Sequence, residues 1–251
     1  EALDLEPEDR QDRAEFAQRQ TLLTLIAEAF AETPYPATPI AVGYEVGLRV
    51  ASAKNFYART GFWAGIAAAA AVSILRGLPA AEFANALAIA AETGPHMCTT
   101  TAPPNWPQPS GTEIKEGIPW GVTTGMTAVS LAQGGMSGPL DIVDHPPFFD
   151  ADRILARFDR PLVCESYTKF QAACRHVHAP VEAVARLVAA HDLDWQDIEK
   201  ITVAAYSGAL RISNSPVPRT VVEAQYSIPY CVALAALRGA ESLMTLGPDD
   251  L

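Results

Sequence analysis

Apolar side chains recur every three or four positions through the first part of the chain, which is the spacing of a helix that buries one face. Residues 9–32 show this pattern first, with Phe16, Leu22 and Ile26 separated by charged positions. We therefore expect a helical bundle in this part of the molecule. The same spacing predicts further helices over residues 40–52, 80–91 and 117–133.

One segment differs because it has no polar face. Residues 65–75 consist almost wholly of Ala, Ile, Val and Leu, and a helix that is apolar all round is normally buried. Gly43 and Gly47 lie in the preceding predicted helix, where they would let a neighbouring helix approach closely. We expect residues 65–75 at the centre of the bundle.

The pattern changes twice further along the chain. Residues 93–112 are rich in Pro and Thr, and a loop of this length in a compact domain is usually functional or mobile. After it, residues 180–191 predict an amphipathic helix, residues 198–205 alternate as a strand does, and residues 223–239 return to helical spacing. Pro229 must lie in the first turn of that last helix or kink it.

These patterns predict a mostly α fold with a large helical domain over residues 1–160 and a smaller α/β domain over residues 161–222. A helical region over residues 223–251 completes the sequence. Both ends are abrupt, so we expect either a piece of a longer protein, with the remainder of the fold outside it, or a chain from which some residues are absent.

The composition supports a sizeable core, because 49% of the 251 residues are hydrophobic and 19% are charged. The formal net charge of −11 leaves no basic excess to neutralise phosphates, so we expect neither nucleic acid nor an anionic membrane as a partner. A small anionic substrate is compatible with this charge, because a few cations in one pocket can set the local potential.

The cysteines and the start of the chain indicate the compartment. Cys98, Cys164, Cys174 and Cys231 form no C-x-x-C pair, so we expect no metal site, and free thiols in a reducing cytoplasm. The first residues are acidic, unlike a signal peptide. The longest apolar stretch, residues 64–75, is too short to cross a bilayer, which needs about 20 residues.

Three segments could carry chemistry, although the sequence has none of the common nucleotide-binding, nucleophile-elbow or zinc-protease motifs. In the first segment, Lys115 lies between the Pro-rich loop and an apolar helix. There its charge and the helix N-terminus would both attract a carboxylate. If buried, this lysine could also act as an acid or base. An ordinary solvated lysine is the alternative.

The second segment holds Lys169, Arg175, His176 and His178 close together. Arginine offers a planar fork for a carboxylate, and histidine can move a proton near pH 7. The pattern does not decide between the two histidines, and a basic surface loop is the alternative. In the third segment, Tyr230 near a helix start is either a general acid or a core tyrosine with a satisfied hydroxyl.

Taken in order, these segments resemble the MmgE/PrpD family, which includes 2-methylcitrate dehydratase, cis-aconitate decarboxylase and iminodisuccinate epimerase. Residues 44–47 are similar to the family's GYEV helix, and residues 86–90 to the ALxIA that precedes its active-site loop. Residues 169–178 resemble its K-x-[FY]-x-x-C-R-x-x-H segment, and residues 226–230 its [FY]-S-x-P-Y segment. The resemblance runs from about residue 40 to residue 240.

The resemblance implies a large helical domain, a smaller α/β lid domain with the site between them, a homodimer and no cofactor. It also implies a lyase, either a dehydratase or a decarboxylase, or else an isomerase or epimerase. Such an enzyme would act on a small di- or tricarboxylic acid through proton abstraction next to a carboxylate. The candidate catalytic residues are then Lys115, His176, His178 and Tyr230, and the candidate substrate-binding residues are Lys169, Arg175 and Trp63.

The chain also departs from the family pattern. No histidine occurs before His96, although family members usually carry a His-containing stretch before the GYEV helix. Trp63 follows Gly61 and Phe62 where many members have a histidine, and an indole cannot exchange a proton at neutral pH. The alternative is a divergent member that binds a less polar ligand, or a catalytically inactive binding or structural paralogue.

Overall fold

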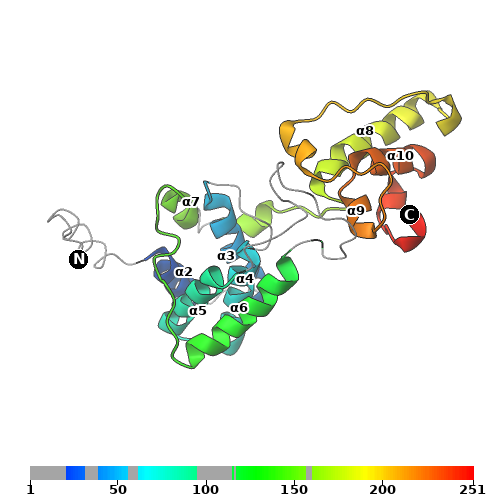
Figure 1. Ribbon diagram of the computed structural model, residues 1–251. Coiled ribbons are helices and arrows are strands. Elements are labelled where there is room, and N and C mark those ends of the chain that lie inside the picture. Colours follow the sequence, from blue (N-terminus) through cyan, green and yellow to red (C-terminus); the bar gives the residue numbers. More distant parts are fainter. Residues whose placement is uncertain (1–20, 32–38, 56–61, 95–114, 116, 157–159) are drawn as a thin grey trace, which may run out of the picture. The chain divides into compact units, whose positions relative to one another are not determined.

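The computed structural model describes residues 21–31, 39–55, 62–94, 115, 117–156 and 160–251. Within these ranges the regular structure is helical and contains no strand, which confirms the mostly α fold. The chain divides into two compact units (Figure 1), one of residues 1–96 with 118–166 and one of residues 97–117 with 167–251. The predictions for residues 9–20 and for most of the loop over 93–112 lie outside the described residues.

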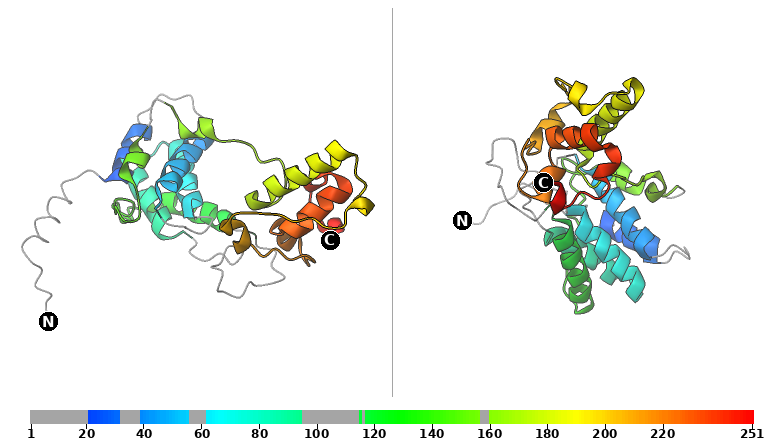
Figure 2. Two further views of the ribbon diagram at one scale, coloured as in Figure 1. Left: turned by 90° about the horizontal axis from the view of Figure 1, so that it is seen from above. Right: turned by 90° about the vertical axis from the view of Figure 1, so that its right-hand side faces the viewer.

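The first unit is a bundle built around α4, as the apolar segment predicted. This helix packs against α3, α5 and α6, and it lies among them in each view (Figure 2). The helices predicted over residues 40–52, 65–75, 80–91 and 117–133 form, with bounds that differ by a few residues, and α2 is the described part of the helix predicted over residues 9–32. The described helices of this unit are α2 (Leu22–Ala31), α3 (Pro39–Ala53), α4 (Phe62–Arg76), α5 (Ala80–Glu92), α6 (Ile118–Gln133) and α7 (Ala151–Leu155), with the 3₁₀ turn η2 (Leu162–Glu165).

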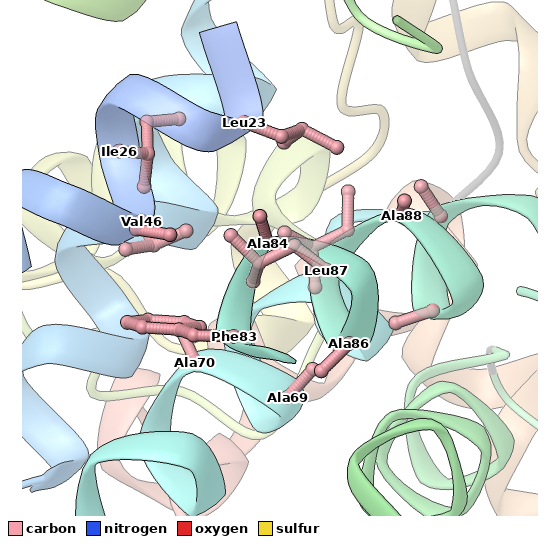
Figure 3. Close-up of a cluster of buried hydrophobic side chains, with 14 of the residues drawn as sticks. Leu23, Ile26, Val46, Ala69, Ala70, Phe83, Ala84, Ala86, Leu87 and Ala88 are labelled. Atoms are coloured by element: carbon pink, nitrogen blue, oxygen red, sulfur yellow. The ribbon is translucent and has the colours of Figure 1, made fainter. Parts of the chain in front are cut away.

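Fully buried side chains from three helices form the core of this unit (Figure 3). Leu23 and Ile26 of α2, Val46 of α3, and Phe83 and Leu87 of α5 are each completely shielded from solvent. Burial of a side chain of this size stabilises the fold by about 1.5–3 kcal/mol relative to exposure. The alanines of α4 and α5 fill the space between them, so the helices can pack at short range.

Glycines set the distance between α4 and its neighbours. A Cβ atom on Gly43 would lie 2.7 Å from the carbonyl oxygen of Ala67, so α3 and α4 meet at a position where only a hydrogen fits. The contact between α6 and α4 is closer still, because a Cβ atom on Gly125 would lie 2.2 Å from the carbonyl oxygen of Gly65. The close helix approach predicted from Gly43 is therefore confirmed, and a second one occurs at Gly125.

A buried ion pair fixes the chain that follows α7 to α3. The side chain of Arg49 is 1% exposed and its Nη2 lies 2.8 Å from Oε1 of Glu45, one turn earlier. Arg49 Nη1 also donates to the carbonyl oxygens of Ile154 and Ala156, each at 2.8 Å. The other carboxylate oxygen of Glu45 accepts from the main-chain N–H of Val163 at 2.9 Å.

The second unit is organised around two packed helices, α8 (Arg175–His191) and α10 (Ile228–Arg238). Val177 and Val181 of α8 are fully buried against Cys231 and Val232 of α10. Helix α8 begins before the predicted residue 180 and continues through Pro180. The remaining described elements are α9 (Val221–Gln225) and the 3₁₀ turns η3 (Trp195–Asp197), η4 (Ser207–Arg211), η5 (Ala240–Leu243) and η6 (Pro248–Asp250).

The helix predicted over residues 223–239 is two helices. The Ser227 hydroxyl interrupts the run, because it accepts a hydrogen bond from the main-chain N–H of Tyr230 at 3.2 Å and so caps α10. Pro229 then lies in the first turn of α10, one of the two positions that the sequence allowed.

The strand predicted over residues 198–205 does not form, and this prediction was wrong. The backbone is extended at both ends, with φ −95° and ψ 104° at Ile198 and φ −72° and ψ 161° at Tyr206. A strand also needs a neighbour, however, and no other described segment pairs with this one. Alternation of apolar residues reports an extended backbone with two faces, and it does not report whether a partner is present.

None of the described helices is long and apolar enough to cross a membrane.

Candidate active site

The N-terminus of α8 is unusually basic. Its first turn carries Arg175, His176 and His178 and no acidic residue, whereas helix N-termini normally favour carboxylates because the helix dipole is positive there. Cys174 occupies the N-cap position without a side-chain capping bond. The dipole and the side-chain charges therefore add, and together they favour an anion at this end of the helix.

The carbonyl oxygen of Ala173 holds two of the predicted residues. Lys169 Nζ donates to it at 2.8 Å, and His178 Nε2 lies 3.2 Å from it. Ala173 is completely buried. The loop that carries it is fixed because the main-chain N–H of Cys174 donates to Gln225 at 2.8 Å. A fixed acceptor between the two side chains keeps both of them at the start of α8.

This hydrogen bond defines the tautomer of the neutral His178 ring. A carbonyl oxygen can only accept, so Nε2 must carry the proton. In the neutral ring, Nδ1 is then the atom that can take a proton. Burial lowers the pKa of His178, and the positive charges of Arg175, Lys169 and Lys115 lower it further, against the opposing effect of the Ala173 hydrogen bond. The ring is therefore held in the form that accepts a proton.

Lys115 belongs to the same group of charges. Its Nζ lies 5.7 Å from the centre of the Tyr226 ring, a distance at which the ring face attracts a cation. Tyr226 is 2% exposed, so the ring gives the ammonium group a rigid apolar support. We use the name cationic cluster for Lys115, Lys169, Arg175 and His178. All of its members come from the second unit.

Arg175, like Lys169, is an exposed member of the cationic cluster. Its Nε donates to the hydroxyl of Tyr167 at 2.8 Å, and its guanidinium carbon lies 5.3 Å from the centre of that ring. The stacking holds one edge of the guanidinium group. The other nitrogen atoms keep the forked geometry that suits a carboxylate.

His176 lies on a different side of α8 from His178. Its Nδ1 is hydrogen-bonded to the hydroxyl of Tyr206, and the two ring centres are 5.4 Å apart. Successive helical residues are rotated by about 100°, so side chains two positions apart point in nearly opposite directions. Burial lowers the pKa of His176. The structure thus brings His178, and not His176, to the cations Lys115, Lys169 and Arg175.

Tyr230 makes its contacts at the end of the chain. Its hydroxyl donates to the main-chain oxygen of Asp250, whose carboxylate pairs with Arg238 at 3.2 Å. Burial and the charge of Asp250 raise the pKa of Tyr230. The tyrosine beside Lys115 is Tyr226, in the same sequence segment but before the break between α9 and α10. The sequence could have identified Tyr226 only through its position in the same segment as Tyr230.

Trp63 belongs to the first unit, at the start of α4. It lines an open groove of about 330 Å³ together with Tyr44 of α3 and Val122 and Met126 of α6. Alanines of α4 also line this groove. The surroundings of the indole ring are therefore almost wholly apolar.

Comparison with family models gives two matches along this chain. Residues 37–151 match the MmgE/PrpD N-terminal domain, and residues 172–250 match the MmgE/PrpD C-terminal domain. A search of the curated proteins found no match. The two matched regions follow one another in order and together cover most of the sequence. The chain therefore belongs to the MmgE/PrpD family.

Proposed function

We propose that this protein is a lyase that acts on a small di- or tricarboxylic acid by removing a proton next to a carboxylate. Membership of a family of dehydratase-type lyases supports the reaction class. One observation supports a di- or tricarboxylic acid as the substrate. The charged groups that shift the pKa of His178 are all cations, Arg175, Lys169 and Lys115, in a chain whose net charge is −11.

The cationic cluster supplies the two things that this chemistry needs. Lys115 and Arg175 would bind substrate carboxylates, and their charges would stabilise the negative charge that develops when the adjacent C–H bond breaks. Nδ1 of His178 would accept the proton, because Nε2 is already committed to Ala173. Lys169 would contribute mainly its charge, since its Nζ donates to the same carbonyl oxygen.

The second half of the reaction differs between the two lyase types. In a dehydration, His178 would take the C–H proton and the hydroxide that leaves must receive a proton. In a decarboxylation, the C–C bond to the departing CO₂ breaks in place of the C–H bond, and the carbanion that remains must receive a proton. His176 and Tyr230 stay candidates for this proton transfer. Each hydroxyl or ring nitrogen already has a hydrogen-bond partner, Tyr206 for His176 and Asp250 for Tyr230, so substrate would have to replace that partner.

Titration calorimetry with citrate, 2-methylcitrate and cis-aconitate tests the binding part of the proposal. The substitution Lys115→Met should weaken binding of the preferred acid about 10- to 100-fold, because one charge-assisted contact is worth about 1.5–3 kcal/mol. Arg186→Met is the matched control for Arg175→Met. Both remove one arginine charge from α8, but Arg186 is exposed and paired with Glu182 at 2.8 Å. If Arg175→Met and Arg186→Met weaken binding of the acid equally, the cationic cluster is not the site that binds it.

Turnover measurements distinguish the residue that accepts the proton from the residues that bind the substrate. The substitution His178→Gln can keep a donor toward Ala173 and cannot take a proton. We expect it to lower the rate of water or CO₂ release by about 10²- to 10⁴-fold, with binding changed only a few-fold. A variant that keeps its turnover would show that His178 is not the base.

The surroundings of Trp63 favour a second candidate function. An indole in a groove lined by Tyr44, Val122 and Met126 suits an apolar group better than a carboxylate. We propose, as the alternative, a divergent family member that binds a less polar ligand, or one that is a non-catalytic partner. Under this alternative, the polycarboxylic acids cause no thermal shift, and a monocarboxylic acid with an aliphatic chain does.

A further inference from the structure

Two cysteines of the second unit are held at one place in the fold, and the proposed reaction uses neither of them. Cys174 is the N-cap residue of α8, and Cys231 lies in α10. Both are anchored to the end of α9. The main-chain N–H of Cys174 donates to the carbonyl oxygen of Gln225 at 2.8 Å, and the thiol of Cys231 donates to the carbonyl oxygen of Ala224 at 3.2 Å.

The packing of α8 against α10 brings the two thiols together (Figure 1). Cys231 is completely buried in the core of the second unit, and Cys174 packs against the same core while it stays partly exposed. The two carbonyl groups that anchor them belong to consecutive residues, whose Cα atoms are about 3.8 Å apart. A disulfide joins residues whose Cα atoms are about 4.4–6.8 Å apart, so a bridge between these cysteines requires a local movement.

The two thiols differ in the way that a redox-active pair requires. Cys174 is partly exposed, at a helix N-terminus and next to Arg175, and thiols in such positions are the reactive ones. Cys231 is shielded from solvent. Burial, and then the neighbouring Cys174, raise the pKa of its thiol to about 12. An oxidant in solution therefore meets Cys174 first. A reactive cysteine with a second cysteine beside it is the arrangement of redox sensors.

We infer that Cys174 and Cys231 form a dithiol site that a peroxide converts reversibly to a disulfide. In the first step, the Cys174 thiolate attacks hydrogen peroxide, an S–O bond forms as the O–O bond breaks, and the released hydroxide takes up a proton to leave as water. In the second step, the Cys231 sulfur attacks the sulfur of this sulfenic acid. The S–S bond forms as the S–O bond breaks, and the oxygen leaves as water with the proton of Cys231. The two thiols together lose two electrons, which reduce one peroxide to two molecules of water.

The bridge acts on the cationic cluster because of where Cys174 lies. The residue before it is Ala173, whose carbonyl oxygen holds Lys169 and His178. The residue after it is Arg175. Cys231 is fixed in the core, so the backbone of residues 173–175 moves when the bridge closes. The disulfide is therefore a switch that changes the geometry of the cationic cluster, whichever ligand the cluster binds.

Peptide mapping of the wild-type protein tests the bridge directly. Trypsin places the two cysteines on separate peptides, residues 170–175 and residues 220–238, and neither peptide holds another cysteine. After treatment with hydrogen peroxide and blocking of the remaining thiols, we expect these peptides to be linked, with two hydrogen atoms fewer than their sum, and to separate in dithiothreitol. The inference is overturned if neither cysteine is oxidised, if Cys174 stops at a sulfenic or sulfinic acid, or if the bridge joins either residue to a different cysteine.

Substitutions test the order of the two steps. In Cys231→Ala, the sulfenic acid at Cys174 has no second thiol beside it, so labelling with dimedone should rise at least about tenfold over the wild type. In Cys174→Ser, peroxide should leave the buried Cys231 unmodified. The exposed Cys164→Ser is the matched control and should leave the bridge unchanged. A far-ultraviolet spectrum that matches the wild type shows that each variant is folded. Oxidation of Cys231 in Cys174→Ser would contradict the proposed order.

The effect on the cationic cluster is measured by NMR without any carboxylic acid present, so the result does not depend on the proposed reaction. Oxidation should move the ring signals of His178, and dithiothreitol should restore them. The signals of His191, at the other end of α8, should not change, and Cys231→Ala should show no response that dithiothreitol reverses. A bridge that forms without moving the His178 signals would show that it is not a switch.

Discussion

Replacing Arg49 by leucine should destabilise the first unit more than any surface substitution does. The change removes the ion pair with Glu45 and the two hydrogen bonds to Ile154 and Ala156. The contact with Glu45 is made at 2.8 Å but without hydrogen-bond angles, so it is chiefly an attraction between charges. Leucine fills most of the space but leaves the carboxylate of Glu45 buried, where it accepts a hydrogen bond from the N–H of Val163.

The loss of stability in Arg49→Leu depends on the buried groups that the substitution leaves without their partner. Glu45 is only 4% exposed, and a buried ion that loses its partner typically costs about 3–5 kcal/mol. Two carbonyl acceptors also lose their donor, and this loss is included in that range. Because a single domain is stable by only about 5–15 kcal/mol, the variant should lose a large part of its stability.

Urea denaturation followed by circular dichroism measures this loss, and the exposed Arg153 provides the control. Arg153 pairs with Asp150 at 3.2 Å, but its side chain is 60% exposed, so Arg153→Leu should cost less than about 1 kcal/mol. The double variant Glu45→Leu with Arg49→Leu should be less unstable than the sum of the single variants, because no unpaired charge is left. A cost below about 1 kcal/mol for Arg49→Leu would refute this reasoning.

Other predictions concern packing, thiols and pH. Gly125→Ala should destabilise by about 1–3 kcal/mol in the same assay, because its methyl group would overlap the carbonyl of Gly65, while the exposed Thr127→Ala should be nearly neutral. Burial, and then the neighbouring Cys174, raise the pKa of the Cys231 thiol to about 12. A thiol reagent at pH 8 should therefore label the exposed Cys164 quickly and Cys231 only after unfolding. Finally, the lowered pKa values of His176 and His178 mean that the unfolded chain binds protons more readily, so their contribution reduces the free energy of unfolding as pH falls below 6.5. Replacing both histidines by glutamine should flatten that part of the pH profile, and an unchanged slope would contradict this assignment.

The helices could be predicted from the sequence because their apolar spacing is a local property. Residues 65–75 indicated their own central position through composition alone, and α4 occupies that position. Arg49 could not be recognised in the same way. Its polar side chain suggests a solvated face, and its burial depends on carbonyl groups more than a hundred positions later in the chain.

The candidate site was predicted in outline and not in detail. The short sequence separation of residues 169–178 could identify them as a group of candidates. Only the hydrogen bond to the carbonyl of Ala173 distinguishes His178 from His176. Likewise the choice between Tyr226 and Tyr230 depends on where α10 begins, which the Ser227 cap determines. The failed strand prediction has a similar cause, because pairing is a property of two segments and periodicity describes one.

We propose that the cationic cluster binds a carboxylate beside a neutral His178 ring. The most direct test is a pH titration of the His178 ring followed by NMR, with and without a saturating small tricarboxylic acid and with His178→Gln to assign the signal. We predict a pKa below 6.5 without ligand and a clear rise with ligand, because a bound anion favours the charged ring. The signal of His191, at the other end of α8, should not respond to the acid. A His178 titration curve that is the same with and without the acid would contradict the account.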